Sequence, residues 1–140
     1  MTHAQMVADL SPYFEGRREI AFAFLFGSHA RGTATRLSDV DVAAYFYPLT
    51  ETFDYQSNVE YPTEHEVWAD AERIVRTDVE LLVLNRASPN IATSALRGIP
   101  LSIKDWGLYA DLGRQLPRDR RVARRRQRVR SSPGSWKHRA

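Results

Sequence analysis

The chain has 140 residues, of which 43% are hydrophobic and 26% are charged, so it is long enough for one domain with its own core. It contains no cysteine, which excludes a disulfide scaffold and a thiolate metal site. The net charge of +3 hides an asymmetry: residues 1–116 carry ten Lys and Arg against sixteen Asp and Glu, whereas residues 117–140 carry ten against one. We therefore expect an acidic folded domain followed by a strongly basic tail.

The first expected elements are a helix and a buried strand. Thr2 and Gln5 have the spacing of a capping box, which predicts a helix over residues 2–10. Pro12 either extends this helix or starts another one. Residues 20–26 are apolar throughout and rich in aromatic side chains, which is typical of a strand that is covered on both faces.

A sharp turn and a short helix are expected at Gly27 and Ser28. Glycine lets the backbone turn and lets a ligand approach without a Cβ in the way. Ser28 stands where a helix would begin, so its hydroxyl can cap that helix or bind a ligand oxygen. The N–H groups at such a helix N-terminus attract phosphate. Gly32 and Thr33 are expected to end the helix early.

A second strand is predicted over residues 38–47, and it carries Asp39 and Asp41. Residues two apart in a strand point to the same face, and their Cα atoms lie about 6.6 Å apart. Two carboxylates at this spacing can converge on a pair of divalent ions. Val40 and Val42 are expected to point the other way, into the core.

The remaining elements follow from capping and turn residues. Residues 49–62 show no period and are interpreted as a loop. Thr63 and Glu66 predict a capping box at the start of an amphipathic helix. Residues 78–85, D-V-E-L-L-V-L-N, are expected to form a third strand.

Beyond the third strand, Pro89 at a first helical position predicts another helix. Residues 99–103 read as a short strand, and their proline places it at a sheet edge. Residues 105–116 read as the last helix, which completes the predicted domain.

Two stretches taken together are similar to a known signature. The pair G-S at Gly27, followed after ten residues by D-V-D from Asp39, resembles the signature of the polymerase-beta-like nucleotidyltransferase superfamily. The surrounding F-G-S-H-A-R-G and L-S-D-V-D-V-A resemble its small branch, the MntA-like minimal nucleotidyltransferase antitoxins, and R-G-I-P-L continues the likeness. The resemblance covers about residues 22–105. It implies an α/β (α+β) fold, a small mixed β-sheet flanked by helices, over residues 1–116.

The resemblance also implies roles for matching residues. In that family the glycine and serine hold the nucleotide phosphates, which assigns this role to Gly27 and Ser28. The paired aspartates bind two Mg²⁺ ions, which assigns metal binding and catalysis to Asp39 and Asp41. Arg31 either neutralises phosphate charge or pairs with an acidic neighbour.

A third carboxylate in the family comes from a later strand, in a stretch resembling V-D-L-V-V-L-N. Aligning L-V-L-N places Glu80 at that position, where the family carries Asp. The extra methylene displaces the carboxylate, whereas reacting groups need placement within about 0.5 Å. Either Glu80 serves with a shifted backbone, or Asp78 replaces it from the same strand face, or the site turns over poorly. We favour Glu80 as the third catalytic and metal-binding carboxylate.

The function that the resemblance implies is transfer of AMP from ATP to a tyrosine hydroxyl of a partner protein. The chain is too small for template-binding regions, so the resemblance implies a protein acceptor. In that family the partner is a HEPN-domain ribonuclease toxin, and the chain would act as its antitoxin. The alternative is a catalytically weak or inactive module that neutralises the partner by masking its surface. The substitution of Glu80 for Asp motivates this alternative.

The basic tail, residues 117–140, has almost no apolar side chains and cannot form a core, so we expect it to be disordered. It is either a solvated extension or an arm for nucleic acid or an acidic partner. Only Trp136 interleaves its arginines, so stacking on single strands is not supported. No leader pattern or membrane-spanning apolar run is visible, and we expect a cytoplasmic protein.

Overall fold

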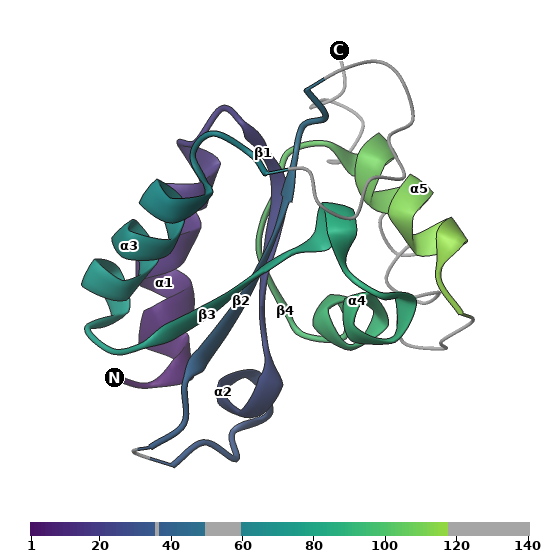
Figure 1. Cartoon of the computed structure of the whole chain (residues 1–140). Coiled ribbons are helices and arrows are strands. Elements are labelled where there is room, and N and C mark those ends of the chain that lie inside the picture. Colours follow the sequence, from purple (N-terminus) through teal and green to yellow (C-terminus); the bar gives the residue numbers. More distant parts are fainter. Residues whose placement is uncertain (36, 50–59, 118–140) are drawn as a thin grey trace, which may run out of the picture.

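The computed structural model describes residues 1–35, 37–49 and 60–117. They form a four-stranded sheet with helices on both faces (Figure 1), which confirms the predicted small mixed sheet. The elements are α1 (His3–Glu15), β1 (Ile20–Phe26), α2 (Gly27–Arg31), β2 (Val40–Phe46), α3 (Glu64–Val75), β3 (Val79–Val83), a 3₁₀ turn η1 (Leu84–Arg86), α4 (Pro89–Leu96), β4 (Ile99–Ile103) and α5 (Trp106–Gln115). Most of the predicted loop and nearly all of the basic tail lie outside the described residues.

The sheet has the strand order β3-β2-β1-β4. The central strand β1 is antiparallel to both of its neighbours, and β2 is parallel to β3. All seven residues of β1 are buried, as predicted from its apolar sequence. The predicted edge position of β4, the strand that contains Pro100, is confirmed.

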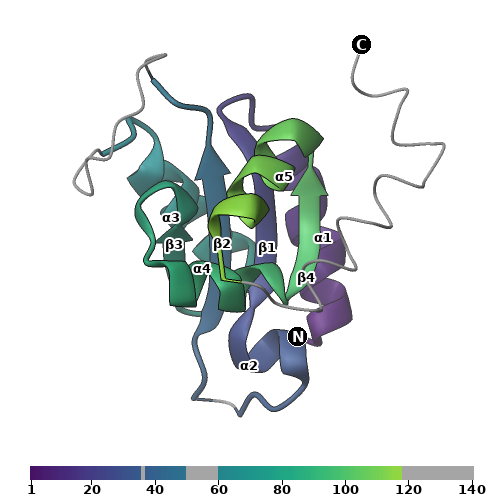
Figure 2. The same cartoon turned by 90° about the vertical axis from the view of Figure 1, so that its right-hand side faces the viewer.

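A separate hydrophobic core lies on each face of the sheet. Helices α1 and α3 cover one face, and α4 and α5 cover the other (Figure 1; Figure 2 looks onto the α4–α5 side). On the second face, Phe22 and Phe24 of β1 pack against Tyr109 of α5, with ring centroids 5.6 and 5.8 Å apart. Truncating one such buried phenylalanine to alanine costs about 3–5 kcal/mol. The central strands are therefore a rigid base for the polar residues at their ends.

Helix α1 is one continuous helix, and Pro12 extends it rather than starting another. The predicted capping box between Thr2 and Gln5 is present at its N-terminus. The helix runs past the predicted end because Leu10 and Phe14, four residues apart, are both fully buried and continue one apolar stripe.

The predicted capping box at the start of α3 is wrong. Thr63 precedes the helix but makes no side-chain cap; its hydroxyl donates instead to Glu19 Oε2 at 2.7 Å. Glu66 turns away to accept a hydrogen bond from Arg17 at 2.8 Å. These long-range contacts compete with the local cap and replace it.

Glu64, the first residue of α3, is the most deeply buried ion-pairing side chain that anchors this helix. It is 6% exposed and accepts hydrogen bonds from the Arg86 guanidinium at 2.7 Å and from the backbone N–H of Tyr61 at 2.7 Å. Burial alone raises the pKa of Glu64, but the hydrogen bonds from Arg86 and Tyr61 outweigh it and lower the pKa. This pair ties α3 to the turn after β3.

The third strand is shorter than predicted and ends at Val83. The backbone then enters η1, and the side-chain amide of Asn85 takes over the pairing with β2. It accepts from the Phe46 N–H at 2.9 Å and donates to the Phe46 carbonyl at 2.8 Å. A side chain thus satisfies the backbone groups that a longer strand would have paired.

The outer edge of β3 is covered by side chains from α3. The Trp68 indole N–H donates to the Val79 carbonyl at 2.5 Å, and the Val79 N–H donates to Glu72 Oε2 at 3.1 Å. Both outward backbone groups of Val79 are therefore occupied. Over the described ranges, the helices are too short or too polar to cross a lipid bilayer.

Candidate active site

The buried strand β1 ends in the sharp turn that the sequence predicts. Gly27 follows Phe26 with φ +73° and opens α2, which ends at a left-handed Gly32 with φ +75°. The early end of the helix is confirmed. The predicted capping role of Ser28 is wrong, because Phe26 occupies the N-cap position without a side-chain bond and Ser28 is already inside the helix.

The backbone of Gly27 lies directly against the carboxylate of Asp41. A Cβ added to Gly27 would lie 2.1 Å from Asp41 Oδ2 and 3.0 Å from Asp41 Cγ. The contact follows from the strand register, in which Asp41 is paired with Phe26 at the end of β1. Glycine is thus required here for two reasons, its positive φ and the space for Asp41.

Glu80 is the register partner of Asp41 on the neighbouring strand β3. Paired residues of adjacent strands point to the same face and lie about 4.8 Å apart. Asp78 lies before β3, one step beyond the Val40–Val79 pair, and its carbonyl accepts the Val40 N–H at 3.0 Å. The structure therefore brings Glu80 beside Asp41, and Asp78 level with Asp39.

The pKa of Asp41 lies above its usual range. Burial raises its pKa, and the negative charges of Glu80 and Asp39 raise it further. The charges of His29 and Arg31 act in the opposite direction. A divalent ion would offset the repulsion among these carboxylates, so the position favours cation binding.

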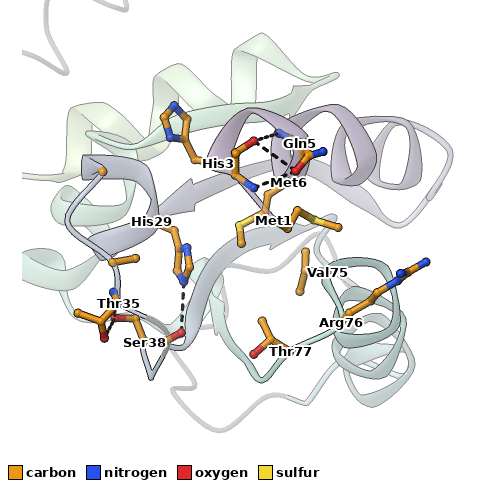
Figure 3. A pocket seen from close by; sticks show the side chains of 13 residues that line it. Met1, His3, Gln5, Met6, His29, Thr35, Ser38, Val75, Arg76 and Thr77 are labelled. Carbon is orange, nitrogen blue, oxygen red and sulfur yellow. Dashed lines mark hydrogen bonds between the residues drawn. The ribbon is translucent and has the colours of Figure 1, made fainter.

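Asp39 lies just before β2 rather than within it, and it is exposed. The residues before it form a turn in which the Thr35 N–H donates to Ser38 Oγ at 2.9 Å. His29 of α2 contacts this turn, because its Nε2 lies 3.2 Å from the Ser38 carbonyl oxygen (Figure 3). Sequence reasoning missed His29, since a single histidine in a five-residue helix carries no motif.

The donor set fits magnesium in its chemistry. Asp39, Asp41 and Glu80 offer only carboxylate oxygens, the ligand type that Mg²⁺ prefers. Within the described residues, no group of three or more His, Cys, Asp or Glu side chains is arranged to hold a metal ion as it stands. The strand register fixes the positions of Asp41 and Glu80. The position of Asp39 therefore decides whether all three carboxylates can bind the same ion.

Arg31 is in the last turn of α2 and is exposed. Its charge lowers the pKa of Asp41, so it acts on the carboxylates from the end of the short helix. This places a cation beside the region assigned to phosphates.

A cavity of about 910 Å³ lies behind the turn that carries Asp39 (Figure 3). Its walls come from the start of α1, from α2 with the following turn, and from the end of α3, and the three carboxylates are not part of its lining. Asp41 instead shares the strand face of Ala43, which belongs to the α4–α5 core. The cavity lining includes Met6 and Val75 of the α1–α3 core, so the cavity and Asp41 lie on opposite faces of the sheet.

A mixed sheet in which β1 ends in a Gly-Ser helix turn, with carboxylates on the paired strands β2 and β3, fits the class of nucleotidyltransferase domains. The chain belongs to the polymerase beta nucleotidyltransferase family, whose model, "Polymerase beta, Nucleotidyltransferase", matches residues 8–106.

Solved structures of toxin–antitoxin complexes share this fold. A toxin–antitoxin complex with AMP-PNP matches with a TM-score of 0.52 and 19% identity over 74% of each chain. A complex of a tri-AMPylated HEPN toxin from Shewanella oneidensis with MNT antitoxin matches with a TM-score of 0.51 and 14% identity over 73% of each chain. A mutant of the MntA toxin–antitoxin complex gives a TM-score of 0.52 with 18% identity over 74% of each chain. No curated protein matches the sequence.

Proposed function

We propose that the chain is a Mg²⁺-dependent nucleotidyltransferase that moves AMP from ATP to a hydroxyl group of a protein partner. The observation that carries the proposal is the pairing of Asp41 with Glu80 beside the Gly27 turn. Two acidic side chains on adjacent strands, next to a helix N-terminus, supply a cation position and a phosphate position side by side.

Each residue in the proposal has a physical role. The backbone N–H groups after Gly27, with the Ser28 hydroxyl, bind the triphosphate oxygens. Asp39, Asp41 and Glu80 hold the magnesium ions. When bound, these ions lower the pKa of the attacking hydroxyl and neutralise charge on the phosphates.

The same site residues orient the reacting groups. The acceptor hydroxyl oxygen attacks the α-phosphorus of ATP and forms a new P–O bond. The bond from the α-phosphorus to the oxygen that bridges it to the β-phosphorus breaks, so that pyrophosphate leaves, and the hydroxyl proton passes to solvent. Arg31 stabilises negative charge on the leaving pyrophosphate.

We further propose that the partner is a HEPN toxin, that the acceptor is a tyrosine hydroxyl, and that the chain acts as the antitoxin. The proposal is supported by the related complexes, one of which contains AMP-PNP and another a tri-AMPylated HEPN toxin.

The first test is calorimetric titration of ATP with Mg²⁺ into the wild type and into Asp41→Asn. Asp111→Asn is the matched control, because Asp111 is an exposed carboxylate on α5, on another element than the proposed ligands. Mg²⁺-dependent binding should be lost in Asp41→Asn and kept in Asp111→Asn. Equal binding by all three proteins would refute the site.

The second test separates AMP transfer from other reactions. The chain is incubated with Mg²⁺ and a purified HEPN toxin, with ATP labelled at the α-phosphate in one reaction and at the γ-phosphate in the other. Transfer of AMP predicts that only the α-label reaches the toxin and that Asp39→Ala abolishes it. Neutralisation of the toxin without labelling would instead favour masking of its surface.

A further inference from the structure

We infer that His29 is a positioning residue for Asp39: its imidazole holds the backbone of the turn directly before Asp39. The inference rests on the proposed function, because it concerns closure of the same metal site. It adds a residue that acts on Asp39 through the backbone of the preceding turn.

The contact that carries the inference joins α2 to the residue directly before Asp39. His29 Nε2 lies 3.2 Å from the Ser38 carbonyl oxygen (Figure 3). A carbonyl oxygen can only accept, so the imidazole carries its proton on Nε2 and donates. His29 is half-buried, which limits competition from water.

The turn itself transmits this contact, because it is closed by its own hydrogen bonds. The Ser38 N–H donates to the Thr35 carbonyl at 3.1 Å, and the Thr35 N–H donates to Ser38 Oγ at 2.9 Å. The Leu37 N–H donates to Thr35 Oγ1 at 3.3 Å. These bonds tie Thr35 and Leu37 to Ser38, so a contact that holds Ser38 also restrains both of them.

Asp39 is thus held between two anchored peptide groups. On one side His29 binds the Ser38 carbonyl; on the other the Val40 N–H donates to the Asp78 carbonyl at 3.0 Å. Without the His29 bond, Asp39 is held from the β2 side alone.

Helix α2 is a suitable support for this contact. Its first residue, Gly27, lies against Asp41, and its end is closed by the Thr33 N–H, which donates to the Ser28 carbonyl at 2.9 Å. One rigid turn of helix therefore touches Asp41 at its start and reaches the residue before Asp39 through His29.

Three substitutions separate the hydrogen bond from the bulk of the ring. His29→Gln keeps an N–H donor at the reach of Nε2, whereas His29→Phe keeps the ring without the donor. His29→Asn keeps a small polar side chain that is too short to reach Ser38, so it serves if the phenylalanine variant folds poorly. A single neutral hydrogen bond corresponds to about a fivefold to tenfold change in an equilibrium constant.

The experiment measures two quantities on wild type and the three variants. Amide hydrogen exchange over residues 33–41, measured without nucleotide, reports how strongly the turn before Asp39 is restrained. Calorimetry of ATP with and without Mg²⁺ reports the metal-dependent part of nucleotide binding. Thermal unfolding confirms that each variant is folded.

We expect His29→Phe and His29→Asn to exchange faster over residues 33–41 and to bind Mg²⁺-ATP about fivefold to tenfold more weakly. His29→Gln should match the wild type, and metal-free ATP binding should be equal in all four proteins. Unchanged exchange, unchanged Mg²⁺-dependent binding, or a glutamine variant as weak as phenylalanine would each overturn the inference while the proposed function stands. Absence of Mg²⁺-dependent binding in the wild type would overturn both.

Discussion

Replacing Gly27 with alanine tests the central contact of the site. The new Cβ would lie 2.1 Å from Asp41 Oδ2, 3.0 Å from its Cγ and 3.2 Å from its Cβ. Rotation of the carboxylate removes the first of these contacts but not the others, since Cβ and Cγ lie close to the strand backbone. The side chain and the β2 backbone must therefore shift together.

The cost of Gly27→Ala has two parts, which a second glycine separates. A left-handed φ costs a residue with a Cβ about 1–2 kcal/mol, and overpacking adds about 1–3 kcal/mol. Gly32 has nearly the same φ, +75° against +73°, but a Cβ there would meet no atom within 4 Å. Gly32→Ala should therefore lower the free energy of unfolding only by the cost of the left-handed φ.

Urea unfolding of the two variants gives the comparison directly. Gly27→Ala should be less stable than Gly32→Ala by about 1–3 kcal/mol, and Asp41→Ala in the Gly27→Ala background should recover most of this difference. Mg²⁺-dependent ATP binding should be lost in Gly27→Ala and kept in Gly32→Ala. Equal stabilities and equal ATP binding for both glycine variants would refute the reasoning.

Three further predictions concern charged groups. Asp41→Asn should raise the melting temperature while it abolishes Mg²⁺-ATP binding, because burial and neighbouring charges raise the pKa of Asp41 and make its ionised form unfavourable in the fold. Glu80→Gln should lower the pKa of Asp41 in an NMR titration, because it removes the neighbouring charge; an unchanged pKa would contradict the pairing. Glu64→Gln should cost about 2–3 kcal/mol at neutral pH in urea unfolding, less than a fully buried pair because Arg86 remains partly exposed. Since the folded-state pKa of Glu64 is lowered, its contribution is present above its usual 4.5 and is lost as the pH falls through the folded value, so the variant should show a weaker loss of stability in acid.

Local patterns were sufficient to predict the central strand and the turn after it. Residues 20–26 are apolar at every position, and Gly27 breaks the run, so both the strand and its end are encoded within residues 20–27. Val40 and Val42 alternate with Asp39 and Asp41, and the predicted position of both valines in the core is confirmed. These features depend on neighbours in the sequence, which is why they are readable there.

Features that depend on pairing between distant segments were not predictable. The sequence left Asp78 and Glu80 as alternatives, and only the parallel register of β3 with β2 places Glu80 beside Asp41. The contact of Gly27 with Asp41 and the hydrogen bond from His29 to Ser38 likewise depend on how separate segments lie against each other. The site roles of these residues stay predictions until binding is measured.

The coverage of Val79 by α3 has a consequence for how other chains can approach. An incoming strand that tried to extend the sheet at β3 would find both outward groups of Val79 already bonded to Trp68 and Glu72. At the opposite edge, Pro100 of β4 has no N–H to donate. Growth of the sheet by edge-to-edge aggregation is thereby discouraged at both ends. A protein that assembles with this domain is expected to dock through side chains rather than add a strand.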